Sequence, residues 1–253
     1  MHFDWSYFWS QLITPSGSFL DGLGLTVLMA VCAEIIGVVL GLVFAQFRLS
    51  RRRGLRYIAS AYVWVMRGTP LLVQIVFIYT GLAAAGILHF HDITVGSLTI
   101  PGNLQAGILA LGLHEAAYMA EIFRSGILAV DVGQFEAAKS LGMPPVMMMR
   151  KVVLPQALRV VLLPIGNQFN ILLKNTTLVS IIGVSEMLLV TETINSVTFR
   201  TFELYAVLGI YFLLLTSAWS LFMSWAEKRL AVGRKPLENT VQIIARKAEA
   251  AES

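Results

Sequence analysis

The sequence contains little charge and almost no cysteine. Asp, Glu, Lys and Arg make up only 13% of its 253 residues, and 57% are hydrophobic. In a soluble domain about a quarter of the residues are charged. The one cysteine, Cys32, lies in the first long apolar run, so neither a disulfide framework nor a cysteine zinc site is expected. The four histidines show no metal-ligand spacing on one helix face. The composition therefore predicts an all-α polytopic membrane protein.

Basic residues are missing from particular segments, and this asymmetry predicts the topology. No Lys or Arg precedes Arg48, residues 88–103 contain none, and Arg200 is the only one of the nineteen in a predicted external segment. Because Lys and Arg gather in short cytoplasmic loops, we expect the N-terminus outside and the C-terminus inside. No secretory leader is expected before the first apolar run. The net charge of +4 follows from this topology and does not indicate nucleic-acid binding.

The apolar runs predict five transmembrane helices, each long enough to cross a hydrocarbon core of roughly 30 Å. Their approximate bounds are residues 23–47, 57–87, 104–128, 156–182 and 204–225. They form one transmembrane domain, residues 1–230, followed by a charged cytoplasmic tail, residues 231–253. The remaining external segments are residues 1–20, 88–103 and 183–203, and the first carries an aromatic cluster suited to the outer membrane interface.

Two of these runs contain residues that disfavour a continuous helix. The second is interrupted at Arg67–Pro70, where Thr69 is expected to cap the following helix and Pro70 to occupy its first turn. The fourth contains Pro164, Gly166, Asn167 and Asn170. These four make it a poor continuous helix and a candidate for lining a cavity.

A polar, helix-forming loop separates the third and fourth spans, and we refer to it as loop 131–155. Residues 134–141 favour a short helix, because Glu, Ala, Lys and Leu all propagate one well. Gly142 can end that helix in the left-handed conformation. Pro144 and Pro145 prevent its continuation, and Pro145 suits the first turn of a second short helix. The loop is therefore predicted to be a rigid pair of short cytoplasmic helices.

Loop 131–155 resembles the EAA loop of permease subunits in ATP-binding-cassette importers. That pattern is Glu-Ala-Ala, three residues, Gly, nine residues, an aliphatic residue, one residue, then Leu-Pro. It falls here, with every spacing kept, on Glu136, Ala137, Ala138, Gly142, Val152, Leu154 and Pro155. Val152 stands where isoleucine is commoner and keeps the β-branched shape. An ordinary interhelical loop is the alternative interpretation of the same residues.

A second stretch resembles the polar amino-acid branch of these permeases. It reads RGTPLLVQ, from Arg67 to Gln74, and its signature residues are Arg67, Gly68, Thr69 and Pro70, together with Pro155 of the EAA pattern. Asn175-Thr176-Thr177 stands where the family more often has Asp-Thr-Ser. The resemblance covers about residues 23–230. It implies a permease subunit of a type I importer that carries polar amino acids across the bacterial cytoplasmic (inner) membrane.

The resemblance also implies partners. Such permeases work as pairs of identical or homologous subunits with a cytoplasmic ATPase dimer and an extracytoplasmic amino-acid-binding protein. They bind no cofactor, and ATP and Mg are used by the ATPase. The sequence has no G-x-x-x-x-G-K-[ST] phosphate loop of its own. The residues expected to contact the ATPase are Glu136, Ala137, Ala138, Gly142 and Met143. Met143, Met147, Met148 and Met149 either add to that contact or pack against this chain's own helices.

Polar residues within the apolar runs are candidates for a substrate path. They are Gln74, Glu115, Tyr118, Glu121, Lys174 and Thr177. A zwitterion needs an acceptor for its ammonium group, which Glu115 or Glu121 can supply, and a donor for its carboxylate, which Lys174 or Thr177 can supply. His114, Tyr118 and Glu121 share a helix face. Glu121 can instead form a structural ion pair with Arg124.

Two other functions fit parts of the sequence. An ion-coupled secondary transporter acting alone would use Glu34, Glu115 and His114 as a proton relay. An intramembrane enzyme would use His114 and Glu115 as its catalytic pair. Adjacent helical residues point about 100° apart, which disfavours the enzyme. The expectation is a transport subunit that is not an enzyme, and the sequence does not specify which amino acid is carried.

Overall fold

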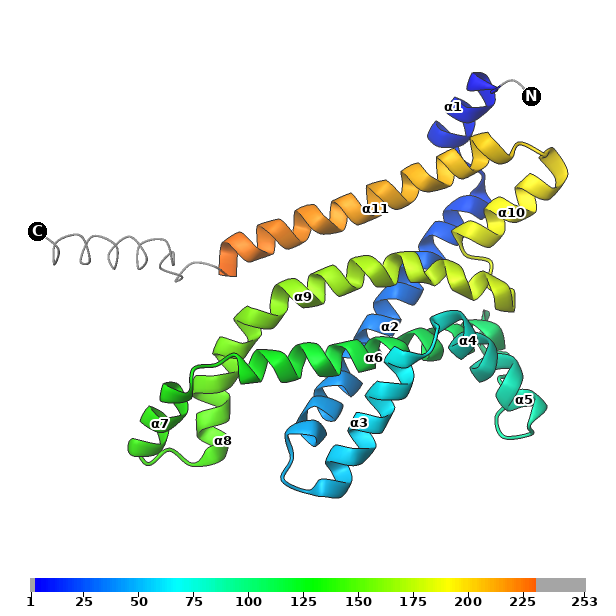
Figure 1. Ribbon diagram of the computed structural model, residues 1–253. Coiled ribbons are helices and arrows are strands. Elements are labelled where there is room, and N and C mark those ends of the chain that lie inside the picture. Colours follow the sequence, from blue (N-terminus) through cyan, green and yellow to red (C-terminus); the bar gives the residue numbers. More distant parts are fainter. Residues whose placement is uncertain (1–2, 231–253) are drawn as a thin grey trace, which may run out of the picture.

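The computed structural model describes residues 3–230, which are mostly helical (Figure 1). The helices are α1 (Trp5–Ile13), α2 (Gly17–Leu49), α3 (Arg53–Gly68), α4 (Leu71–Val76), η1 (Phe77–Gly81), α5 (Leu82–Ala84), α6 (Gly102–Leu128), α7 (Val132–Ser140), α8 (Pro145–Met148), η2 (Met149–Val153), α9 (Leu154–Asn175), η3 (Thr176–Ile182), α10 (Met187–Thr198) and α11 (Thr201–Leu230). Of these, η1 and η2 are π-helical and η3 is a 3₁₀ helix. Strands β1 (Ile93–Val95) and β2 (Leu98–Ile100) form a hairpin before α6. The predicted tail, residues 231–253, lies outside the described residues.

Among the described residues, three single helices are long and apolar enough to cross a membrane: α2, α6 and α11. Two further spans arise only if bent pairs are counted as one span each. The segment from α3 to α5 bends by 110°, and the segment from α8 through η3 to α10 bends by 53°. The second predicted span, residues 57–87, is therefore two helices that meet at a sharp corner. The count is three to five candidate spans.

Helices α2 and α6 pack closely against each other, because α2 presents small residues to α6 at every fourth position. Ala33, Gly37, Gly41 and Ala45 are all buried. A Cβ atom on Gly37 would lie 2.7 Å from Cγ of Glu115, and one on Gly41 would lie 3.0 Å from the backbone nitrogen of Ala120. Small residues in such a stripe let two backbones approach, which is how membrane helices gain packing contacts.

Helix α9 is continuous through Pro164, and the prediction of a poor helix is wrong here. A proline removes one backbone hydrogen bond, but neighbouring helices can satisfy the freed groups within a membrane. Trp219 of α11 donates from its indole nitrogen to the carbonyl oxygen of Gly166, at 2.7 Å. The indole therefore ties α11 to the backbone of α9 two residues beyond the proline.

The N-terminal segment contains a helix that the sequence analysis missed. Asp4 caps α1 by accepting a hydrogen bond from the backbone nitrogen of Tyr7. Its carboxylate also pairs with Arg200, which stacks on the ring of Tyr7. The hydrogen bond from the Tyr7 backbone and then that from Arg200 lower the pKa of Asp4. These contacts hold α1 beside the start of α11, as Figure 1 shows.

The segment 183–203 is also more ordered than predicted. Most of it forms α10, and the fully buried side chain of Glu186 caps that helix by accepting from the backbone nitrogens of Leu188 and Leu189, each at 2.9 Å. A second contact ties α10 to α2, because the backbone nitrogen of Met187 donates to the hydroxyl of Thr26. The predicted loop 88–103 likewise contains the β1–β2 hairpin.

Candidate functional site

Loop 131–155 forms two short helices at one end of the molecule (Figure 1). Asp131 begins α7 by accepting from the backbone nitrogen of Gly133. Gly142 adopts a φ of +69° after the helix. Its backbone nitrogen donates to Lys139, and that of Met143 donates to Ala138. This pair of bonds is a Schellman motif, which ends a helix sharply and satisfies its last carbonyl groups.

The second helix begins at Pro145, as the sequence predicted. Because proline cannot continue α7 but suits the first turn of α8, the chain reverses within a few residues. The π-helical η2 then leads into α9 at Leu154 and Pro155. The loop is therefore fixed by local chemistry at each of its turns.

The loop presents a mixed polar and apolar surface. Glu136, Ala137 and Gly142 are exposed, Ala138 is buried and Met143 is partly buried. Leu141 and Val146 are 80% and 69% exposed, so the surface of the loop includes aliphatic side chains. The methionines of the loop differ in burial. Met148 and Met149 pack against this chain's own buried cluster around Val153, whereas Met147 is 41% exposed.

The corner between α3 and α4 is held by Gln74. Its amide nitrogen donates to the carbonyl oxygen of Met66 and to the hydroxyl of Thr69, each at 2.8 Å. The predictions that Thr69 caps α4 and that Pro70 lies in its first turn are both wrong, because Pro70 occupies the N-cap position and no side chain caps that helix. Thr69 instead accepts from Gln74 and donates to the carbonyl oxygen of Val65.

Gln74 also connects this corner to α6. Its amide oxygen lies 3.0 Å from Nδ1 of His114. The amide nitrogen of Gln74 is already directed at acceptors, and its amide oxygen can only accept a hydrogen bond. We therefore assign the proton of the neutral His114 ring to Nδ1, which donates to this oxygen. The ring of His114 lies 5.1 Å from that of Tyr118, and the guanidinium of Arg67 lies 5.2 Å from the Tyr118 ring. The signature turn and the polar face of α6 thus form one connected group.

Glu121 lies at the end of this group and joins three helices. Its Oε1 lies 2.6 Å from Arg48 at the end of α2 and 3.4 Å from Arg67 at the end of α3, and its Oε2 pairs with Arg124 at 3.0 Å. Both carboxylate oxygens are therefore engaged. The ion pair with Arg124 that the sequence suggested is present.

Glu115 lies on a different side of α6 and is fully buried. It packs over Gly37 of α2, and its Oε2 accepts from the amide of Gln168 of α9, at 3.3 Å. Its Oε1 has no hydrogen-bond partner among the described residues, and neither has the carboxylate of Glu34. The sequence analysis missed Gln168, because only the packing of α9 against α6 brings it to Glu115.

Lys174 lies beside a groove of about 450 Å³ between α9 and α11. The groove is lined by Asn170, Lys174, Thr216, Ser217, Ser220 and Leu221. Asn170 donates to the hydroxyl of Ser220 at 2.9 Å, and its own carbonyl oxygen is without a partner in the described structure. Thr177 follows at the next turn and donates to the backbone of Lys174. Because Gln168 faces Glu115 and Asn170 faces α11, the structure places Glu115 and Lys174 on opposite sides of α9.

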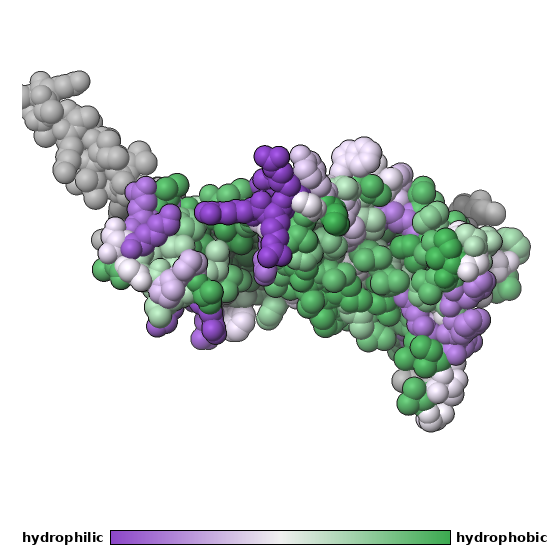
Figure 2. All heavy atoms as spheres, turned by 90° about the horizontal axis from the view of Figure 1, so that it is seen from below, coloured by the Kyte–Doolittle hydropathy of each residue, from purple (hydrophilic) through white to green (hydrophobic). Residues whose placement is uncertain are grey.

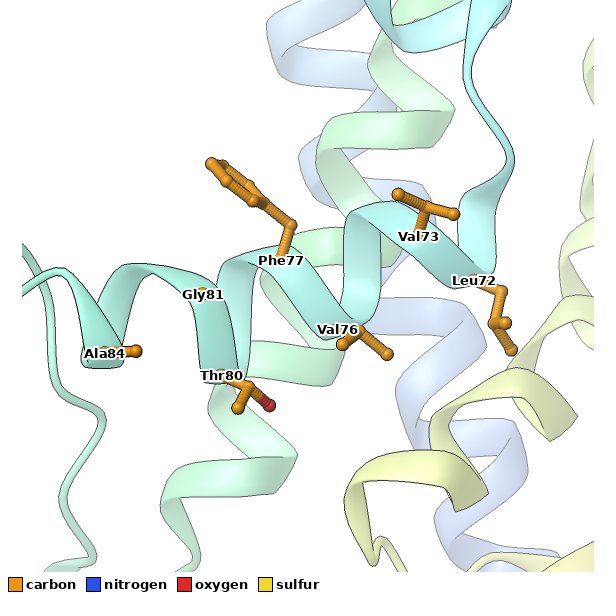
Figure 3. Close-up of a pocket in the computed structure, with 7 residues that line it drawn as sticks. All are labelled: Leu72, Val73, Val76, Phe77, Thr80, Gly81 and Ala84. Atoms are coloured by element: carbon orange, nitrogen blue, oxygen red, sulfur yellow. The ribbon is translucent and has the colours of Figure 1, made fainter.

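A second groove runs along α4, η1 and α5 (Figure 3). It measures about 530 Å³ and is lined by Leu72, Val73, Val76, Phe77, Thr80, Gly81 and Ala84. Only Thr80 among these carries a polar side chain. A polar ligand would gain too few hydrogen bonds there to offset its desolvation. In the part of the chain that the structure describes, no three His, Cys, Asp or Glu side chains are placed to hold a metal ion.

Loss of the Gln74 contacts is expected to destabilise the corner. Gln74→Leu has a similar size but leaves the carbonyl oxygen of Met66, the hydroxyl of Thr69 and the Nδ1–H of His114 without this partner. Burial without compensation costs about 1–3 kcal/mol for such groups, so the melting temperature of the purified protein should fall. Gln11→Leu is the matched control, because Gln11 makes no side-chain hydrogen bond among the described residues. Equal melting temperatures for the two variants would contradict the role given to Gln74.

These features define a helical membrane protein of several spans, with a fixed two-helix loop at one end and polar residues where its helices meet. The model of the family described as "Binding-protein-dependent transport system inner membrane component" matches residues 37–232. The chain belongs to this family, and the resemblance drawn from its sequence is confirmed.

Individual relatives extend over nearly the whole chain. The octopine transport system permease protein OccM of Rhizobium meliloti is 36% identical over 251 residues, covering 94% of this chain and 96% of the relative. The glutamine transport system permease protein GlnP of Escherichia coli K12 is 31% identical over 232 residues, covering 92% and 100%. A solved structure described as an amino acid ABC transporter with histidines superposes with a TM-score of 0.79 and 39% identity, covering 90% of this chain and 100% of that one.

Proposed function

We propose that this chain is the membrane-spanning subunit of an ATP-driven importer that carries polar amino acids across the bacterial inner membrane. It would act in a pair with an identical or homologous permease, a cytoplasmic ATPase dimer and an extracytoplasmic binding protein. The observation that carries the proposal is loop 131–155, in which Glu136 and Ala137 are exposed on a helix that is fixed by an N-cap, a Schellman motif and a following proline. The amino-acid permeases and the transporter that the chain resembles support the same function.

The shape of the loop suits contact with an ATPase. Ala137 and Gly142 have no bulk to prevent close approach, and Glu136 offers a carboxylate for a charge-assisted hydrogen bond. Leu141 and Val146 add exposed aliphatic surface that a partner would bury. Because η2 continues directly into α9, a displacement of the loop would act on that helix and on the residues packed against it. ATP-driven closure of the partner would thereby shift the permease between inward-open and outward-open states.

Lys174 is the best-placed substrate contact among the six predicted from the sequence, whereas the hydroxyl of Thr177 donates to the backbone of Lys174. Lys174 is exposed, and it lies beside a groove with an amide and three hydroxyl groups. A carboxylate there would accept hydrogen bonds from the ammonium group and from the hydroxyl of Ser217, since the hydroxyls of Thr216 and Ser220 donate to backbone carbonyl groups. Gln74 and Glu121 already have structural partners, Tyr118 packs against His114 and Arg67, and Glu115 is buried. An ammonium acceptor for the same substrate would therefore have to come from elsewhere than Glu115 of the same chain.

Replacement of Lys174 by methionine tests this assignment. Lys174→Met keeps much of the side-chain length but removes the donor, so uptake of the amino acid should fall at least tenfold while ATPase association is unchanged. Arg159→Met is the control, since Arg159 is a second exposed cation on the same helix but lies near its other end. Unchanged uptake in Lys174→Met would remove Lys174 from the substrate path.

The function itself is tested with the chain co-expressed with its genomic neighbours and reconstituted in nanodiscs. ATP hydrolysis is measured with a binding protein loaded in turn with each polar amino acid. Stimulation by one of them supports the importer and identifies the substrate. Transport by the purified chain alone, driven by an ion gradient with no ATPase present, would instead support a secondary transporter.

A further inference from the structure

The turn between α2 and α3 carries an arginine cluster that no contact described above explains. It consists of Arg51, Arg52, Arg53 and Arg56, all exposed, and residues 48–67 contain no Asp or Glu. Arg48 and Arg67, which flank the cluster, both pair with Glu121. Within residues 3–230, none of the four cluster members forms a salt bridge. The turn therefore holds a concentrated positive charge without internal compensation.

The surface beside this cluster is apolar and aromatic. Tyr57 and Ile58 of α3 are 68% and 64% exposed, and Trp64, two turns further along the helix, is 77% exposed. Ala59 and Val63 on the other face of α3 are buried against the rest of the protein. Helix α3 thus presents an apolar face outward, with arginines at its start and aromatic rings along it.

Figure 2 shows how these features combine. On the face seen from below, a group of hydrophilic side chains stands on a broadly hydrophobic surface, at the position that the α2–α3 turn occupies in Figure 1. Helices α7 and α8 lie along the same lower side of the molecule as the α2–α3 turn in Figure 1, to the left of it. The arginine cluster therefore belongs to a turn separate from loop 131–155, and the exposed apolar face of α3 begins directly beside it.

We infer that the arginine cluster is a binding site for the phosphate groups of anionic phospholipids in the cytoplasmic leaflet. Guanidinium groups pair with phosphate through two parallel hydrogen bonds. Clusters of four or more basic residues directly beside a membrane helix attract anionic lipid headgroups. The lipid chains would lie along the exposed face of α3, and Tyr57 and Trp64 have the amphipathic rings that membrane interfaces favour. A soluble anion would gain the charge contacts but would leave that face uncovered.

Native mass spectrometry of the full chain, purified with any partner that accompanies it, measures this binding directly. The probes are dioctanoyl phosphatidylglycerol, dioctanoyl phosphatidylcholine and inorganic phosphate, each titrated at low ionic strength. Phosphatidylglycerol should bind at least tenfold more tightly than the other two. The affinity should fall as salt is raised, since surface charges are screened over about 10 Å at 0.1 M salt.

Two variants of the arginine cluster and one control variant distinguish an effect of the positive charge on lipid binding from a general disturbance of the fold. Replacing all four arginines by glutamine should weaken phosphatidylglycerol binding at least tenfold, whereas replacing all four by lysine should keep most of it. Arg150, Lys151 and Arg159 are exposed basic residues near the other loop. Their replacement by glutamine should leave lipid binding unchanged.

Three results would overturn the inference. Equal binding of phosphatidylglycerol by the glutamine variant would place the lipid elsewhere on the protein. Binding of inorganic phosphate as tight as that of the lipid would make the cluster a free-anion site. Loss of the ATPase from the glutamine variant, with lipid binding intact, would make the cluster a protein contact. Each readout is independent of transport, so failure of the proposed function would not be mistaken for failure of the lipid site.

Discussion

Gly142→Val is expected to lower ATP hydrolysis stimulated by the loaded binding protein at least tenfold. The reason is the φ of +69° at Gly142, a conformation that disfavours residues with a Cβ atom by about 1–2 kcal/mol. A β-branched side chain is the least tolerant of it. Nothing lies within 4 Å of an added Cβ, so the effect comes from backbone strain and not from a clash. The Schellman motif would open, and α7 would lose its fixed angle to α8.

The chain offers a matched control for this strain. Gly86 has a φ of +68° and equally open surroundings, but it follows α5 and lies outside loop 131–155. Gly86→Val should therefore carry similar strain and leave stimulated hydrolysis near the wild-type rate. Gly142→Asn should retain much of the activity, since asparagine enters the left-handed region more readily. Full activity of Gly142→Val would show that the geometry of the loop does not matter for coupling.

Loop 131–155 was predictable from sequence because its structure is determined locally. A helix-forming run, a glycine that accepts positive φ and two prolines act within a few residues of one another. Contacts with other parts of the chain are not needed to determine where these two short helices begin and end. The break at Arg67–Pro70 was predicted for the same reason, since proline restricts the residue before it. The 110° angle there depends on Gln74 reaching back across the corner, and no local signal indicates it.

The external elements were missed because they depend on distant partners. Helix α1 is held by contacts between Asp4 and the start of α11, about two hundred positions away in the chain. Helix α10 is capped by Glu186, whose burial the sequence does not reveal because a glutamate near an external segment is normally exposed. A search for capping residues before short apolar runs would have found Asp4, but not Glu186, because glutamate is not a preferred N-cap residue.

The partners of the candidate substrate residues were likewise not predictable from the sequence, because they lie on other helices. Helical spacing correctly put His114 and Tyr118 on one face of α6, but it could not tell which neighbours that face would meet. Gln74 and Glu121 proved to have partners within the chain. Glu115 and Lys174 proved to lie on opposite sides of α9. Periodicity assigns faces within one helix, whereas a binding site requires the faces of several helices to be known together.

The largest effect on the fold is expected from Gly41→Leu. A Cβ atom at this position would come too close to the Cβ atom of Met119 and would lie 3.0 Å from the backbone nitrogen of Ala120, so the obstruction is mostly main chain that cannot rotate away. Helices α2 and α6 would have to separate along the stripe from Ala33 to Ala45. Overpacking typically costs about 1–3 kcal/mol and occasionally more. We expect a cost at the upper end of this range for Gly41→Leu, because separating α2 from α6 also removes the contacts of Met119 and Phe123 in their buried cluster.

Gly24→Leu provides the comparison within the same helix. Gly24 is exposed, and no atom lies within 4 Å of its added Cβ. Leucine also forms helix better than glycine, by somewhat less than about 1 kcal/mol. Thermal denaturation in detergent should therefore show Gly24→Leu at or slightly above the wild-type melting temperature and Gly41→Leu about 5–10 °C below it. Equal melting temperatures would mean that α2 and α6 can move apart without loss. The close approach of their backbones would then not be what holds the core of the permease together.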